Sequence, residues 1–360
     1  MKKLVSLSII IITLFLCLAS CRSEKYPPVK STEEEARVVM TLSLDGEKYE
    51  VKYELYRALF LSHKSAVDGG DNSVWSSSKK DEYISKINEI ITSKASEIFS
   101  AFHLAQKLGI DAYSKDVDEQ IKEYIGISVD NGYGGDYDAY LASLKEQGLN
   151  YSAQELLIRY SIMLSGIDEY YKGSEDEALG YIPGEYEYSE EDVRDYYFGN
   201  NSARVFHAYM QDGILVDTAG KMEEIREGLA SAESDIDAAL YIINNTSVTP
   251  TDLIRDKEPS GIMVGRHTFG SGYEPYTEAA FALGTGEVSE VIKTDGDGFF
   301  YVIYKLEKTE EHFTACYDDI SLSYLENLIG EQLYNIALSL TSSVTFTDSY
   351  SKIVHKDISI

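Results

Sequence analysis

Few side chains in this sequence have the types and spacing that enzyme chemistry requires. The six histidines lack the spacing of metal ligands, and no pair of acidic residues lies in a context that separates a general acid from a general base. The Gly-Thr-Gly segment at residues 284–286 is too short for a phosphate-binding loop. We therefore expect no metal ion and no cofactor. The candidates that remain are His207 and the aromatic residues after it, although a lone strand histidine is more often a hydrogen-bonded core residue.

The elements that must position His207 fall between residues 203 and 307. The stretch 203–210 is a probable strand that contains His207, and a helical pattern follows around residues 219–232. The segment 261–266 precedes a run at residues 276–289 that reads Tyr-Thr-Glu-Ala-Ala-Phe-Ala-Leu-Gly-Thr-Gly-Glu-Val-Ser. A second strand is predicted at residues 298–305. These signals predict a compact unit of sheet and helix.

This order of elements resembles the parvulin-type peptidyl-prolyl isomerase domain, and the run at residues 276–289 is the most specific match. The resemblance implies an activity that rotates Xaa-Pro peptide bonds, whose barrier of about 18–20 kcal/mol comes from amide resonance. No covalent step is needed for that reaction. A catalyst has to hold the proline in an apolar pocket and favour the twisted amide with preorganised hydrogen bonds.

The resemblance also assigns roles to individual residues. The first family histidine corresponds to His207, and the position of the second histidine falls on Phe300, so these two are the candidate catalytic positions. The implied substrate-binding residues are Tyr276, Phe281, Met263 and Tyr273. Because the histidine pair is halved and Met263 stands where the family has Asp or Cys, the sequence leaves open whether the isomerase is active.

The amino terminus predicts export and a lipid anchor. Lys2 and Lys3 precede an apolar run over residues 4–18, which is typical of a secretory signal and too short for a stable membrane span. The ending Leu-Ala-Ser-Cys resembles the bacterial lipobox. It implies a lipoprotein in which residues 1–20 are removed and Cys21 carries the lipid, with palmitate as a typical acyl chain. A plain cleaved signal is the alternative. Cys316 would be the last cysteine of the mature chain, and we expect it to be buried on a helix.

The flanking regions are predominantly helical. A strand pair is predicted at residues 38–44 and 49–51 around an Asp-Gly turn, and Ser152 and Ser189 are predicted helix caps. The amphipathic helices are predicted at residues 53–61, 82–108, 114–125, 137–147, 152–171, 189–198 and 322–340. A short strand follows at residues 344–347. A lone apolar helix after the isomerase-like unit cannot bury its own stripe, so we expect it to pack on the amino-terminal part.

Together with the parvulin-like unit, this order of parts resembles secreted foldases of the SurA and PrsA type. The resemblance implies an α+β fold: a mostly helical, discontinuous chaperone domain with a small strand pair, and an inserted parvulin-like α+β domain. The predicted divisions are a signal peptide at 1–20, a tether at 21–36, a chaperone domain at 37–200, the isomerase-like domain at 201–308 and a completing segment at 309–360.

The formal net charge of −29 makes a nucleic-acid partner improbable, because such a surface repels phosphate backbones. The expected partners are unfolded or proline-containing secreted polypeptides and a membrane reached through Cys21. A homodimer is possible. Three functions stay open: a lipid-anchored isomerase and chaperone on the extracytoplasmic side, a holdase chaperone with a degenerate parvulin domain, and a solute-binding or adhesive lipoprotein. The third predicts repeated βα units or sandwich strands, which the sequence does not contain.

Overall fold

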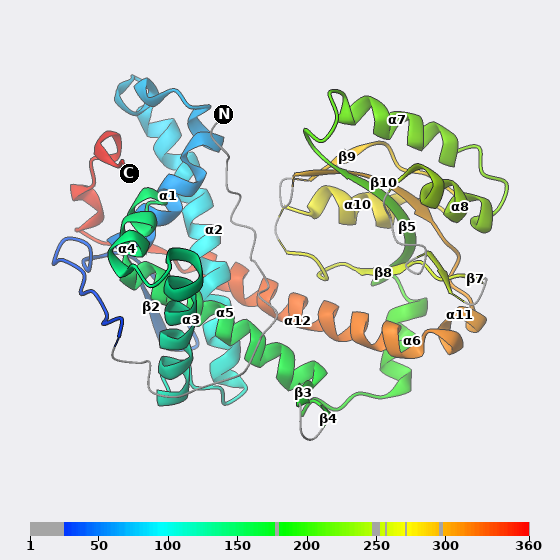
Figure 1. Ribbon diagram of the computed structural model, residues 1–360, viewed down its shortest axis with the longest axis horizontal. Coiled ribbons are helices and arrows are strands. Elements are labelled where there is room, and N and C mark those ends of the chain that lie inside the picture. The colour runs from blue at the N-terminus through cyan, green and yellow to red at the C-terminus, as the bar shows by residue number, and fades with distance from the viewer. Residues whose placement is uncertain are drawn as a thin grey trace. The chain divides into compact units, whose positions relative to one another are not determined.

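The structure is a computed structural model that describes residues 25–176, 180–246, 253–255, 258–270, 272–294 and 298–359. It divides into two compact units (Figure 1). Of the described residues, the helical unit comprises 25–176 and 332–359, and the sheet unit comprises those from 180 to 331. The predicted α+β class, with a discontinuous helical part and an inserted part that contains a sheet, is confirmed. The predicted signal peptide and Cys21 lie outside the described residues.

The helical unit holds five complete helices within the described residues. They are α1 (Tyr53–Asp68), α2 (Lys80–Lys107), α3 (Lys115–Tyr133), α4 (Tyr137–Glu146) and α5 (Tyr151–Lys172). Its strands are β1 (Val38–Leu44), β2 (Glu47–Lys52), β3 (Ser174–Asp176) and β11 (Thr345–Phe346). The 3₁₀ turns are η1 (Asn72–Ser76), η2 (Tyr350–Lys352) and η3 (His355–Asp357). The second half of α12 (Tyr317–Ser342) also belongs to this unit.

The helices form where the apolar periodicity predicts them, with local corrections. α1 continues to Asp68 and ends at Gly69, whose φ of 60° is left-handed and ends a helix at little cost. The Gly-, Asn- and Ser-rich stretch that follows contains η1. The predicted cap of α5 was wrong. The cap is Asn150, whose side-chain oxygen accepts from the N–H of Ala153.

The beginning and the end of the chain share one small antiparallel sheet, ordered β11-β1-β2. Met40 of β1 lies opposite Phe346 of β11, and the N–H of Thr347 donates to the carbonyl of Val39 at 3.0 Å. Next to this sheet, the Tyr56 hydroxyl lies 2.9 Å from Nε2 of His355. The carboxyl-terminal segment therefore completes the core to which β1 and β2 belong.

The sheet unit is built on four antiparallel strands in the order β8-β5-β10-β9. These strands are β5 (Ser202–Gln211), β8 (Ile262–Gly265), β9 (Ile292–Lys293) and β10 (Phe299–Lys305). The unit also contains β4 (Gly180–Ile182), β6 (Ile254–Arg255), β7 (Glu258–Pro259), α6 (Glu190–Phe198), α7 (Thr218–Leu229), α8 (Asp235–Asn245), α10 (Glu274–Ala282) and α11 (Glu310–Ala315). The first half of α12 belongs to it as well. The predicted cap of α6 is confirmed, because Ser189 and Asp192 form a reciprocal capping box.

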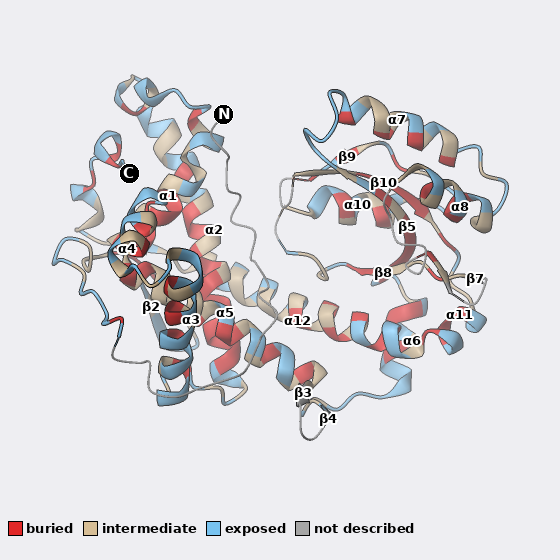
Figure 2. Cartoon of the chain, in the orientation of Figure 1, coloured by how far each residue is buried: buried red, intermediate tan, exposed pale blue. Residues whose placement is uncertain are grey.

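Helices cover both faces of this sheet. Buried residues of α7 and α8 pack on Phe206, Ala208 and Val302, while α10 packs on the other face through Tyr276 and Ala280. The two central strands are accordingly mostly buried (Figure 2). α8 was not predicted from the sequence. Cys316 is buried as expected, but it lies between α11 and α12 rather than within a helix.

Of the helices in the described residues, none combines the length and the apolar character that crossing a lipid bilayer requires.

Candidate functional site

His207 lies on the face of the sheet that α10 covers. The antiparallel register places it opposite Ile303, and it places Tyr209 opposite Tyr301. Because residues two apart on a strand share a face, and directly opposed residues share it too, His207, Tyr209 and Tyr301 point the same way. This face of β5 and β10 is therefore lined by one imidazole and two phenol rings.

Tyr276 of α10 closes the site from the other side. Its hydroxyl lies 2.8 Å from Nδ1 of His207, and its side chain is only 1% exposed. Burial lowers the pKa of His207 to about 4 and raises the pKa of Tyr276. Both groups are therefore neutral near pH 7, and they share one hydrogen bond whose direction depends on the tautomer of the imidazole.

Further rings surround this pair and form what we call the aromatic cluster, defined as His207, Tyr209, Phe269, Tyr273, Tyr276, Phe299 and Tyr301. The ring centroid of His207 lies 5.4 Å from that of Tyr209 and 5.7 Å from that of Tyr301. Tyr276 and Tyr301 approach to 5.1 Å at 72°. Edge-to-face pairs at such distances are favourable, so the rings are held by their neighbours.

The predicted site residues fall into two groups. The structure brings Tyr276 directly to His207, and Tyr273 joins the cluster by stacking on Phe269 at 5.4 Å. Phe281 packs on the same core, and the guanidinium carbon of Arg266 lies 4.2 Å from the centroid of its ring.

The structure does not bring Phe300 or Met263 to His207. Phe300 packs on the opposite face of the sheet, with the core beneath α7 and α8. Met263 packs against the core formed by α6, α11 and α12, whereas its strand neighbours Ile262 and Val264 face the aromatic cluster. Side chains alternate along a strand, so a motif alignment displaced by one residue selects the wrong face.

Tyr301, Tyr209 and Phe269 were not identified from the sequence. The signal for Tyr301 was present, because β10 reads Phe-Phe-Tyr-Val-Ile-Tyr-Lys and its alternation places Tyr301 and Ile303 on one face. The pairing of β10 with β5 was needed to show that this face is the one that carries His207.

The chemistry available at this site is non-covalent. A neutral imidazole and several phenol groups can donate or accept hydrogen bonds, and the rings offer apolar contact area. Among the described residues, no group of His, Cys, Asp and Glu could hold a metal ion. The site is thus suited to binding an apolar ring by contact with its aromatic rings and to forming hydrogen bonds with a neutral peptide group.

Comparison with known proteins returned matches among solved structures alone. No family model and no curated sequence matches this chain. The chain is similar to foldase protein PrsA from Streptococcus pneumoniae, at 17% identity over 88% of this chain and 98% of that one, with a TM-score of 0.27. It is also similar to foldase protein PrsA from Lactococcus lactis, at 16% identity over 90% of this chain and 100% of that one, with a TM-score of 0.27. PrsA from Bacillus subtilis matches at 17% identity over 86% of this chain and 93% of that one, with a TM-score of 0.24.

The predicted resemblance to PrsA-type foldases is thus confirmed as a likeness. At these identities and TM-scores, the activity of this chain has to be argued from its own site.

Proposed function

We propose that this protein is an extracytoplasmic foldase that binds Xaa-Pro segments of unfolded polypeptides at the aromatic cluster and catalyses their cis–trans isomerisation. The observation that carries the proposal is the contact of His207 with Tyr276 on a sheet face lined by rings. Aromatic rings provide apolar contact for a pyrrolidine ring. A neutral hydrogen-bonding pair beside them can favour the twisted amide without a charge that would need solvation.

The hydrogen bonds matter because the transition state of this reaction differs from the substrate in one respect. Rotation removes amide resonance, so the prolyl nitrogen no longer shares its lone pair with the carbonyl group and becomes pyramidal. Groups that bond to this twisted form more strongly than to the planar one lower the barrier. His207 and Tyr276 come from separate elements that pack against each other, which holds their geometry before the substrate arrives.

A second function, binding of unfolded chains without isomerisation, is favoured by one feature of the helical unit. The unit contains a hollow of about 430 Å³ lined by apolar and charged side chains, among them Phe99, Leu55 and the exposed Tyr113. Ligand sites of this kind are commonly several hundred Å³ in volume. We infer that the helical unit contributes chaperone activity and that a lipid on Cys21 retains the protein at the membrane.

The experiment that tests the isomerase role compares variants that remove one interaction at a time. The measured quantity is kcat/KM for cis-to-trans conversion of a short Xaa-Pro peptide. We expect His207→Ala and Tyr276→Phe each to lower it by about tenfold, which corresponds to about 1.4 kcal/mol of transition-state stabilisation. Tyr276→Phe is preferred to Tyr276→Ala because the ring is buried and its loss would open a cavity. Kinetics unchanged in both variants would reject this site.

Suppression of aggregation of a denatured client tests the chaperone role separately. We expect the full mature chain to suppress aggregation, and His207→Ala to do so equally well. A chain without residues 38–200 should lose the effect. Aggregation that proceeds at the same rate with and without the full chain would reject the chaperone role and leave the isomerase result standing.

A further inference from the structure

The outer edge of β2 in the helical unit borders the hollow of about 430 Å³. β2 is the last strand in the order β11-β1-β2, so within the described residues it pairs with β1 and has no strand on its other side. Four of its residues, Lys48, Tyr49, Glu50 and Lys52, line the hollow. An edge strand beside open space is where another extended chain can add by main-chain hydrogen bonding.

The pairing of β1 with β2 shows which backbone groups of β2 face the open edge and could bond to another strand. The N–H of Ser43 donates to Oγ of Ser343 at 2.8 Å, so the backbone of Ser43 faces away from β2. Ser43 lies opposite Lys48, and Thr41, two residues earlier, lies opposite Glu50. In an antiparallel pair of strands, hydrogen-bonded and non-hydrogen-bonded residue pairs alternate. Because the backbone of Ser43 faces away from β2, Ser43 and Lys48 form a non-hydrogen-bonded pair. Thr41 and Glu50, two residues along, form another. The N–H and C=O groups of Lys48 and Glu50 therefore face the open edge, where the described part of the chain supplies no acceptor or donor for them.

The two faces of β2 define what could pair with it. Val51 is buried and Tyr49 half-buried, whereas Lys48, Glu50 and Lys52 are exposed. A strand added at the edge continues both faces, because its side chains alternate in the same way. Its apolar side chains would meet the rings of Tyr49 and Phe99, which lie 5.2 Å apart. Its polar side chains would meet a Lys-Glu-Lys row, which favours opposite charges.

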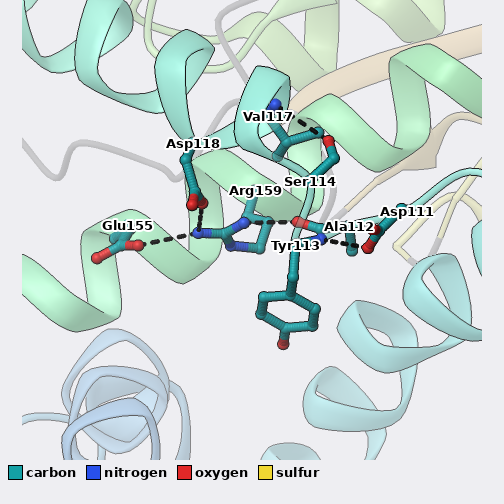
Figure 3. Close-up of polar contacts among 8 residues, drawn as sticks. All are labelled: Asp111, Ala112, Tyr113, Ser114, Val117, Asp118, Glu155 and Arg159. Atoms are coloured by element: carbon teal, nitrogen blue, oxygen red, sulfur yellow. Dashed lines mark hydrogen bonds and ion pairs between the residues drawn. The ribbon is translucent and has the colours of Figure 1, made fainter.

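Arg159 of α5 also lines the hollow and is only 5% exposed. Its guanidinium donates to the carbonyl of Ala112 at 2.5 Å, and it is paired with Asp118 at 2.8 Å and Glu155 at 2.9 Å (Figure 3). The same guanidinium carbon lies 4.8 Å from the ring centroid of Tyr113.

This arrangement holds an exposed aromatic ring in place. Tyr113 is 68% exposed, yet its turn is tied by Arg159 at the carbonyl of Ala112 and by Asp111, which accepts from the N–H of Tyr113. A ring that is ordered before binding loses less conformational entropy when a partner covers it. Tyr113 is therefore a preformed contact in the lining of the hollow.

We propose that an extended, amphipathic segment of an unfolded polypeptide adds as a strand to the open edge of β2 and places its apolar side chains in the hollow. The inference rests on the proposed client-binding role of the helical unit and does not depend on isomerase chemistry. An extended chain is the occupant because unpaired N–H and C=O groups recurring along a strand require a partner with the same repeat. A helix uses its own backbone groups internally and cannot supply them.

The binding experiment uses the full mature chain and a fluorescent peptide of sequence Val-Glu-Phe-Lys-Phe-Glu-Val, followed by fluorescence anisotropy. The control peptide has the same side chains but carries N-methyl groups on its charged residues. Those three residues would lie opposite Lys48, Glu50 and Lys52, so methylation removes the donors that would face the outward backbone groups of Lys48 and Glu50. We expect the control peptide to bind at least about tenfold more weakly, since each lost ladder bond is worth a factor of a few.

Matched protein variants test the same edge. Glu50→Pro removes the outward N–H at a position where an edge strand tolerates proline, and Glu50→Ala keeps that N–H. We expect Glu50→Pro to weaken peptide binding by about tenfold and Glu50→Ala by less than about threefold. Tyr113→Ala should weaken binding severalfold, while Tyr334→Ala, which removes another exposed tyrosine of the same unit, should leave it unchanged. The Tyr113 and N-methyl results decide the matter if Glu50→Pro does not fold.

Several outcomes would overturn this inference. Equal affinity for the two peptides, or equal affinity of the two Glu50 variants, would exclude pairing with the edge. A dimer in sedimentation that Glu50→Pro abolishes would assign the edge to a second copy of the chain. Aggregation suppression that persists alongside any of these results would leave the proposed function intact.

Discussion

His207 and Tyr276 are 69 positions apart in the sequence, and their hydrogen bond exists because β5 and α10 pack face to face. The pair is placed among rings that exclude charge, and both groups are neutral near pH 7. At such a position, the desolvation of a charged imidazole would cost more free energy than its contacts would return. The site therefore offers shape and neutral hydrogen bonds rather than charge.

The two faces of β10 give the first prediction. Tyr301→Leu should lower kcat/KM for an Xaa-Pro peptide by about tenfold, because Tyr301 contacts His207 and Tyr276. Phe300→Leu is the matched control, since Phe300 packs beneath α7 and α8. It should change kcat/KM by less than about twofold while costing a comparable 1 kcal/mol or so of stability. The opposite order of effects would contradict the proposed site on the face that carries His207.

The second prediction concerns the protonation of His207. Its pKa is lowered from the ordinary 6.5 to about 4 by burial, so its ring protons should titrate near pH 4 in an NMR experiment, with His207→Gln identifying the signal. Between these values the unfolded chain binds more protons than the folded chain. The stabilising contribution is therefore complete above pH 6.5 and is lost as the pH falls towards 4. A titration midpoint near 6.5 would contradict the buried, neutral imidazole.

The same residues show what sequence reasoning could and could not reach. His207, Tyr276, Tyr273 and Phe281 could be chosen as candidates because a family motif marks them locally. Phe300 and Met263 were chosen by matching a motif without a register, and each side chain faces a different core from His207. Tyr301 needed the pairing of β10 with β5, which is a long-range fact that local patterns do not contain.

Among the elements, helices were the most predictable and sheet pairing the least. The apolar stripe over residues 82–108 predicts α2 to within two residues at each end, because helical periodicity is local. The short strand near residue 345 could be predicted from alternation, but its partner β1, some three hundred positions earlier, could not.

The third prediction tests how the end of the chain holds the helical unit. His355 and Tyr56 are both buried and share a contact of 2.9 Å. His355→Ala should lower the free energy of unfolding by about 1–3 kcal/mol, because the Tyr56 hydroxyl loses a buried partner. The single tryptophan, Trp75, lies in this unit, so its fluorescence during urea unfolding reports on it alone. The exposed control Lys356→Ala should leave the urea midpoint unchanged. Equal urea midpoints for the two variants would show that the contact between His355 and Tyr56 does not stabilise the unit.

For the molecule as a whole, the fourth prediction concerns its location. If a lipid on Cys21 anchors the protein, Cys21→Ser should move it from the membrane fraction to the soluble extracytoplasmic fraction, because the acyl chains supply the membrane affinity. The measurement is fractionation followed by immunoblotting, with metabolic labelling by a palmitate analogue. Unchanged membrane retention in Cys21→Ser would reject the anchor, and retention without label would point to another mode of attachment.

The division into two units separates the two proposed activities, so they can be tested apart. The aromatic cluster belongs wholly to residues 179–331, and the hollow beside β2 belongs wholly to the helical unit. Variants at His207 should therefore spare peptide binding at β2, and variants at Glu50 should spare turnover.

The rate of cis-to-trans conversion of a short Xaa-Pro peptide is the measurement that bears most directly on the proposed function. The protein should accelerate this conversion well above the uncatalysed rate, and His207→Ala should remove most of the acceleration. Wild-type protein that converts the peptide no faster than buffer would contradict the central claim that this site is an isomerase.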